Sequence, residues 1–312
     1  MTRNKAAGYL LGIVAASSYG MNPLFALPLY TDGMNPDSVL FFRYLLALPL
    51  LGGMLYARGH NLRISSAREF FLLMVMGLTV AISSLSLFAS YNYMAAGIAS
   101  TLLFVYPILV ALLMAIVFHE RVTGITWICL IMALSGIGVL YKGGDGTTLS
   151  FAGTMLVILS SLSYAVYIVA VNKTSLNRVP TLRLTFYILL FGLLLFCLRL
   201  ACGVPLTLPS SSQWSLWSNL VALAVIPTAI SFLSTTAAIK IIGPTPTAIL
   251  GAFEPVTAII FGITVFHEAL SARDVAGIIL IIAAVSMVIA SESMTRALTR
   301  MRHLFPRIHR NK

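Results

Sequence analysis

Charged side chains are scarce in this chain of 312 residues, because only 9% are Asp, Glu, Lys or Arg while 59% are hydrophobic. A soluble domain usually has about 25% charged and about 45–50% apolar residues, so the composition excludes an ordinary soluble protein. No polar stretch is long enough to form a soluble catalytic domain. We therefore expect one domain that lies almost entirely in lipid, and no enzyme.

Motifs for catalysis and cofactor binding are also missing. The three cysteines are an odd number, which does not suggest a disulfide framework. The Phe-His-Glu runs at 118–120 and 266–268 lack the second histidine of a zinc-binding His-Glu-x-x-His motif, and the glycines at 143–146 lack the Lys-Ser/Thr ending of a P-loop. We expect no metal, no cofactor and no ATPase activity.

What the chain does contain is ten apolar stretches, each close to the roughly 20 residues that a helix needs to cross a bilayer. Helices are required because lipid offers backbone amides no hydrogen-bond partner, and the alternating pattern of barrel strands is absent. The predicted spans are 6–28, 37–57, 69–90, 95–117, 124–141, 150–172, 180–201, 215–238, 246–266 and 273–291.

Basic residues fall almost entirely on one side of this predicted topology. With the N terminus in the cytoplasm, only Lys142 and Arg273 lie in the opposite loops. This asymmetry follows the positive-inside rule, and it explains the net charge of +11 without a nucleic-acid partner. We expect a multi-pass protein of the bacterial inner membrane with both termini in the cytoplasm and with membrane lipids and a small solute as partners.

The two halves of the chain repeat one another. The matches are Pro107 with Pro255 and Val-Phe-His-Glu at 117–120 with 265–268 at an offset of 148 residues, and Ser18 and Tyr19 with Ser163 and Tyr164 at an offset of 145. A set of five spans ends on the side opposite to its start, so its repeat must be inverted. The predicted fold is an all-α membrane protein of ten transmembrane helices, arranged as inverted five-helix repeats at 1–145 and 146–292 with a basic cytoplasmic tail at 293–312.

These features resemble the EamA-like branch of the drug/metabolite transporter superfamily, in which spans four and nine carry a mid-span proline and end in a glutamate. The residues that match are Pro107 with Glu120 and Pro255 with Glu268. The resemblance implies a secondary transporter, expected here to export amino acids or similar small metabolites by alternating access, driven by protons or exchange. Drugs, sugars or nucleotide-linked solutes are alternative cargoes. An enzyme acting on membrane lipids and a receptor are rival classes. The sequence does not indicate the oligomeric state.

Two charges are expected inside the membrane. Glu254 lies at mid-depth of the ninth span, where a carboxylate is costly and so marks a functional site, and its repeat equivalent is Tyr106. We expect Glu254 to bind a cationic group or to carry a coupling proton, unless it satisfies backbone groups freed by Pro255. Arg43, in the second span, is expected to bind a substrate carboxylate or to pair with Glu254, with bracing of a neighbouring helix as the alternative.

Polar residues recur at helical spacing in four spans and can face a central cavity. Close helix packing is the alternative use for the serines and threonines. Pro107 and Pro255 are the expected bending points. The predicted substrate-binding residues are Tyr19, Asn22, Arg43, Ser83, Tyr106, Tyr164, Tyr167, Ser231 and Glu254.

Overall fold

The structure is a computed structural model. It describes residues 3–59, 62–119, 150–210, 212–242, 250–251, 253–267, 269–273, 275–284 and 286–287, and a few positions between 124 and 139. Most of the predicted fifth span, the predicted boundary between the repeats, the tail at 293–312, and Glu120 and Glu268 therefore lie outside the described residues.

All secondary structure in the described part of the chain is helical, as the composition predicted. Within the described residues, seven spans are long and apolar enough to cross a membrane, and two shorter apolar helices are Phe253–Thr264 and Val275–Ala284, so the predicted number of ten spans stays a prediction. The elements are α1 (Arg3–Gly20), α2 (Asn22–Thr31), α3 (Pro36–Ala57), α4 (Ala67–Ser90), α5 (Ala96–Leu103), α6 (Tyr106–Phe118), α8 (Phe151–Lys173), η1 (Ser175–Arg178), α9 (Thr181–Ala201), α10 (Trp214–Ala224), η2 (Val225–Ile230), α11 (Ser231–Ile242) and α13 (Phe253–Thr264).

Short polar side chains fix where several spans begin. The Asn35 side chain accepts a hydrogen bond of 2.7 Å from the backbone N–H of Ser38, and Pro36 supplies a first helical residue that has no N–H to satisfy. Ser66 accepts a bond of 3.1 Å from the N–H of Glu69 at the start of α4. The turns between spans are therefore encoded locally, by residues that satisfy the free amides of each helix start.

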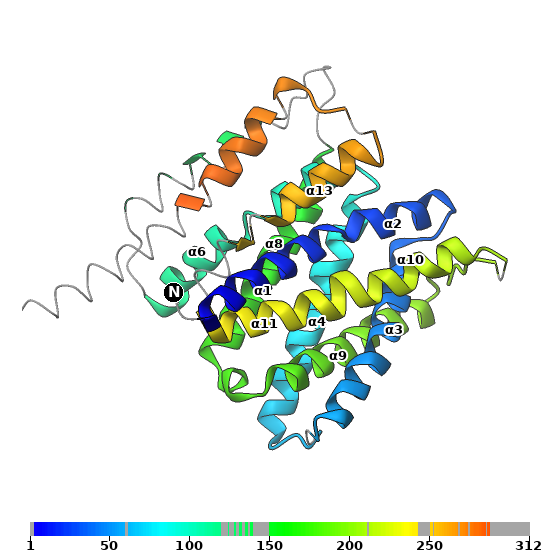
Figure 1. Cartoon of the computed structure of the whole chain (residues 1–312), viewed down its shortest axis with the longest axis vertical. Coiled ribbons are helices and arrows are strands. Elements are labelled where there is room, and N and C mark those ends of the chain that lie inside the picture. The colour runs from blue at the N-terminus through cyan, green and yellow to red at the C-terminus, as the bar shows by residue number, and fades with distance from the viewer. Residues whose placement is uncertain are drawn as a thin grey trace, which may run out of the picture.

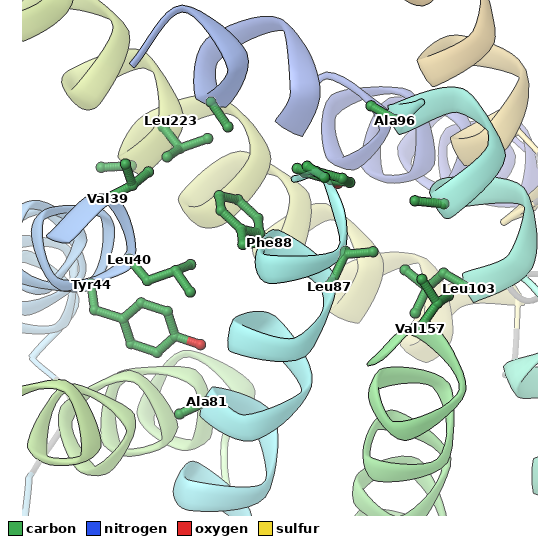
Figure 2. Close-up of a cluster of buried hydrophobic side chains, with 14 of the residues drawn as sticks. Val39, Leu40, Tyr44, Ala81, Leu87, Phe88, Ala96, Leu103, Val157 and Leu223 are labelled. Atoms are coloured by element: carbon green, nitrogen blue, oxygen red, sulfur yellow. The ribbon is translucent and has the colours of Figure 1, made fainter. Parts of the chain in front are cut away.

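The spans pack into a bundle in which segments far apart in sequence lie side by side. Helix α1 runs along α11, and α4 packs against both α8 and α9 (Figure 1). Helix α13 contacts α1 and α5. Figure 2 shows side chains from several helices converging on the main apolar core, among them Leu40 and Tyr44 of α3, Phe88 of α4 and Leu223 of α10.

Three spans are interrupted at a proline. The first span changes from α1 to α2 at Met21, just before Pro23, and the fourth changes from α5 to α6 just before Pro107. The eighth contains a π-helical turn, η2, around Pro227. Each interruption follows from the missing proline N–H, which leaves the carbonyl four residues earlier without its helical donor.

Side-chain hydroxyls replace two of these lost donors. Ser161 of α8 donates a hydrogen bond of 3.1 Å to the carbonyl of Leu103, to which Pro107 has no N–H to donate. Thr228 donates one of 3.0 Å to the carbonyl of Leu223, which Pro227 cannot reach. The interruptions are thus tolerated in lipid because neighbouring hydroxyls satisfy the freed backbone groups.

The two repeats end equivalent helices in the same way. His119, after α6, and His267, after α13, have φ angles of 54° and 53°, and they are the non-glycine residues with positive φ in the described part of the chain. They are 148 residues apart, the same offset as the prolines. A residue in this left-handed conformation terminates a helix, which gives both histidines a structural role.

Ion pairs join the repeats near the ends of the spans. Arg199 of α9 pairs with Asp37 at the start of α3, and Arg183 pairs with Glu69 at the start of α4 at 3.1 Å. Because the Arg199 side chain is 42% exposed, we assign its pair a role in fixing loop geometry more than in stability.

Candidate functional site

Glu254 lies in the first turn of α13 and is only 9% exposed. Its carboxyl group makes no hydrogen bond or ion pair with any residue that the structure describes. Gly20 of α1 lies directly against the backbone of α13: a Cβ atom at Gly20 would collide with the backbone oxygen of Glu254 and would lie 2.9 Å from Cβ of Thr257. The absence of a side chain at Gly20 therefore lets α1 and α13 approach closely at the backbone of Glu254.

Tyrosines from four segments lie within electrostatic range of this carboxylate. Tyr19, Tyr91, Tyr106 and Tyr164 all lie close enough to interact with it electrostatically. The rings of Tyr106 and Tyr164 meet edge to face with centroids 4.9 Å apart. Tyr167 stacks on Tyr164 at 6.0 Å, so the aromatic surface extends along α8.

Arg43 is 2% exposed and is held by the interrupted eighth span. Its Nε donates a hydrogen bond of 2.6 Å to the Thr228 hydroxyl, and its Nη2 approaches the carbonyl of Pro227 at 3.5 Å. The guanidinium lies over the rings of Tyr19 and Phe88, at 5.8 and 5.3 Å from their centroids. These contacts fix the arginine in place.

Arg43 and Glu254 do not form an ion pair, so the pairing considered from the sequence is absent from this structure. Tyr19 lies under the Arg43 guanidinium and within electrostatic range of Glu254. The site therefore holds one positive and one negative group that remain separate.

Three buried side chains in this region, those of Asn22, Arg43 and Tyr91, have polar atoms without a hydrogen-bond partner among the described residues. Asn22 is 1% exposed, and neither its Oδ1 nor its Nδ2 has a hydrogen-bond partner among the described residues. Nη1 of Arg43 also has none. Asn22 follows Tyr19 by three residues, at the interruption of the first span. A buried polar group without a partner costs about 1–3 kcal/mol, so these atoms mark a place where a ligand or water is expected to bind.

Ser83 and Ser231 join helices. The Ser83 hydroxyl donates a hydrogen bond of 2.9 Å to the carbonyl of Ser160, and the Ser160 hydroxyl donates one of 2.7 Å to the carbonyl of Ser83. Ser231 donates a bond of 2.9 Å to the carbonyl of Ala15. Ser83 and Ser231 are 148 residues apart and Ala15 and Ser160 are 145 apart, so the two crossings occupy equivalent positions in the repeats.

The structure thus brings Tyr19, Tyr106, Tyr164 and Glu254 together, with Arg43 next to Tyr19 and Tyr167 next to Tyr164. Ser83 and Ser231 lie in helix crossings instead. Sequence reasoning did not include Tyr91 or Phe88, because both depend on how the end of α4 packs. Thr228 was not among the predicted binding residues, and its position directly after Pro227 is the signal that could have singled it out.

Other features of the described residues do not add to this site. An open groove of about 480 Å³ on α10 and η2 is lined by Trp214, Trp217, Ser218, Val221, Ala222, Val225 and Ile226. It contains no ionisable side chain, so it does not suit a charged solute. No group of three His, Cys, Asp or Glu residues in the described part of the chain could hold a metal ion.

Comparison with known proteins agrees with the duplicated architecture. The model of the EamA-like transporter family matches the chain twice, over residues 6–142 and 151–290. A solved structure titled "Crystal structure of protein" superposes with a TM-score of 0.68 at 19% identity, over 94% of this chain and 99% of that one, which establishes a shared fold. No curated protein matches. The family indicated by the sequence is confirmed.

Proposed function

Because the chain belongs to the EamA-like transporter family and is a membrane transporter of small molecules, we propose that it exports amino acids or similar zwitterionic metabolites across the bacterial inner membrane. The observation that carries the proposal is Glu254, a buried carboxylate without a partner among the described residues, together with the fixed cation of Arg43 over the ring of Tyr19, which is within electrostatic range of both charges. A solute with one ammonium and one carboxylate group matches two such separate charges. Phosphorylated cargo fits less well, since Arg43 is the single Lys or Arg among the buried side chains of the described residues.

The transport cycle that we propose is alternating access by two inverted five-span repeats, with the N and C termini in the cytoplasm. Support comes from the equivalent crossings at Ser83 and Ser231 and from the matching helix ends at His119 and His267. Since Glu254 is almost fully buried, a solute reaches it only after helices move apart. The interruption at Pro107 and the first turn of α13 at Pro255 are the proposed bending points.

Purified protein in liposomes tests this function. Counterflow of labelled amino acids should be measured for the wild type and for Glu254→Gln, between about pH 5 and pH 8. We expect Gln at this position to abolish transport if the carboxylate binds the ammonium group, or to remove its pH dependence if the carboxylate carries the coupling proton. Glu69→Gln is the matched control, because it removes a carboxylate that already pairs with Arg183, and it should keep the wild-type pH dependence. Transport by Glu254→Gln that equals the wild type across this range would refute both roles.

A further inference from the structure

The unpaired polar side chains of the site stand at positions where the other repeat has aromatic or aliphatic residues. The equivalent pairs are Asn22 with Tyr167 and Arg43 with Ile188 at the offset of 145 residues, and Glu254 with Tyr106 and Thr228 with Val80 at the offset of 148. In each pair the residue named first is polar, whereas the second is aromatic or aliphatic. At all four positions, therefore, one set of equivalent residues is polar and the other set is aromatic or aliphatic.

The two sets of residues belong to different groups of helices. The polar set lies on α2, α3, η2 and α13, which together with α1, α10 and α11 form what we call the polar bundle, joined by contacts of α1 with α11 and α13 and of α3 with η2. Its equivalents lie on α4, α6, α8 and α9, which with α5 form the aromatic bundle, joined by contacts of α4 with α8 and α9 and of α6 with α8. The bundles meet where α3 packs against α9 and α13 against α5, and Glu254 of α13 lies within electrostatic range of the tyrosines of α6 and α8.

Equivalent contacts differ in chemistry between the bundles. In the polar bundle, Arg43 donates to Thr228 at 2.6 Å. In the aromatic bundle, the equivalent residues Ile188 and Val80 belong to one apolar cluster. Tyr106 and Tyr164 present ring surface at the place where the polar bundle presents the Glu254 carboxylate.

The unmet hydrogen-bonding capacity of the polar bundle matches both charged groups of an amino acid. Nη1 of Arg43 and Nδ2 of Asn22 are donors that lack acceptors, which a carboxylate supplies. Oδ1 of Asn22 lacks a donor, and the buried Glu254 carboxyl group accepts no hydrogen bond from a described residue, so an ammonium group can supply donors to both. The aromatic bundle offers ring surface to the rest of the solute.

We propose that an α-amino acid binds with its ammonium and carboxylate groups against the polar bundle and its side chain against Tyr106, Tyr164 and Tyr167, so that amino acids with apolar or aromatic side chains are the preferred substrates. This inference rests on the proposed function and names its substrate class. Arg43 and Asn22 bind the carboxylate, Glu254 binds the ammonium group, and the three tyrosines determine selectivity for the side chain.

Competition against counterflow of labelled L-phenylalanine in proteoliposomes tests the orientation. L-Phenylalanine and L-leucine should compete at least about tenfold more strongly than L-serine, because apolar contact with a pocket typically discriminates by about tenfold or more. Phenethylamine, which lacks the carboxylate, and 3-phenylpropanoate, which lacks the ammonium group, should both compete at least about tenfold more weakly than L-phenylalanine.

Variants separate the two bundles. Tyr106→Ala and, independently, Tyr164→Ala should reduce the preference for phenylalanine over serine by about tenfold, whereas Arg43→Gln should weaken both amino acids alike and remove the advantage of phenylalanine over phenethylamine. Tyr56→Ala is the matched control, because Tyr56 is 90% exposed at the end of α3, and it should keep the wild-type preference.

Equal competition by serine and phenylalanine in the wild type, or an unchanged preference in both tyrosine variants, would overturn the inference while leaving amino acid transport intact. Absence of counterflow with every amino acid would instead refute the proposed function and the inference with it. Binding measured by thermal shift in detergent should show the same order of preference. It provides a second readout for any variant that is poorly reconstituted.

Discussion

Helix α4 and the eighth span occupy equivalent positions in the two repeats, 148 residues apart, yet only α4 is continuous. In α4 the Thr79 hydroxyl donates a hydrogen bond of 2.8 Å to the carbonyl of Val75. In the eighth span, Pro227 stands in place of Thr79, and the hydroxyl has moved one residue to Thr228, which donates to the equivalent carbonyl, that of Leu223. The equivalent carbonyls of the two repeats, those of Val75 and Leu223, thus accept hydrogen bonds from residues at different positions.

The shift gives Thr228 a second contact that Thr79 does not have. Its single hydroxyl proton goes to Leu223, so its oxygen can accept the bond from Nε of Arg43. One repeat therefore has a regular helix at this position, whereas the other has an irregular helix whose Thr228 holds a buried cation. Matched substitutions in the two bundles test how far this division holds.

The largest effect on stability is expected from Thr228→Val, which introduces the side chain that the equivalent position Val80 already has. Two buried groups, the Nε of Arg43 and the carbonyl of Leu223, lose their partner, at about 1–3 kcal/mol each. Thr79→Val should cost less than about 1 kcal/mol, because the carbonyl of Val75 keeps its helical amide donor. Thermal unfolding in detergent measures both variants, and equal losses would show that the two spans are equivalent after all.

A smaller loss is expected from Gly20→Ala, because the new methyl group would meet the backbone of Glu254 and Cβ of Thr257 at 2.9 Å. Overpacking of this kind costs about 1–3 kcal/mol, and it should also displace the carboxylate and impair transport. The reverse change at the equivalent position, Ala165→Gly, should cost about 0.5–1 kcal/mol through helix propensity and should leave selectivity unchanged. Wild-type stability and transport in Gly20→Ala would contradict the close approach of α1 and α13.

Both bundles contain much that the sequence predicted and some that it did not. Helical spans, the repeat offsets and the burial of Glu254 follow from composition and periodicity, since lipid permits few other arrangements. The partner of Arg43 does not, because Thr228 lies 185 residues away and meets it only in the folded bundle. For the same reason, sequence spacing grouped Ser83 and Ser231 with the site, although they join helices.

The helix crossings should respond more weakly. Interhelical hydrogen bonds in membranes contribute about 0.5–2 kcal/mol, so Ser83→Ala, which disrupts the reciprocal pair with Ser160, should lower the free energy of unfolding by about 1–2 kcal/mol. Ser231→Ala removes a single bond to Ala15 and should cost about 0.5–1 kcal/mol. Unfolding in a denaturing detergent compares the two. A greater loss in Ser231→Ala would reverse the expected order of the crossings.

Glycine substitutions at the helix ends should have the smallest effect. His267→Gly is expected to change stability by less than about 0.5 kcal/mol, because glycine adopts the left-handed conformation without steric cost. His267→Val should cost about 1–2 kcal/mol, because a branched side chain is disfavoured there. His119 should behave alike in the first repeat. A large loss in either glycine variant, measured by thermal unfolding, would show that the imidazole has a partner of its own.

Access to the site from both membrane faces tests the central claim most directly. Ser18 lies one turn before Asn22 and is 6% exposed, so a single cysteine placed there by Ser18→Cys, with the three native cysteines changed to serine, reports on the site. A membrane-impermeant maleimide should react with it in right-side-out and in inside-out vesicles, and added phenylalanine should slow both reactions. Reaction from one face only, with or without the amino acid, would contradict alternating access.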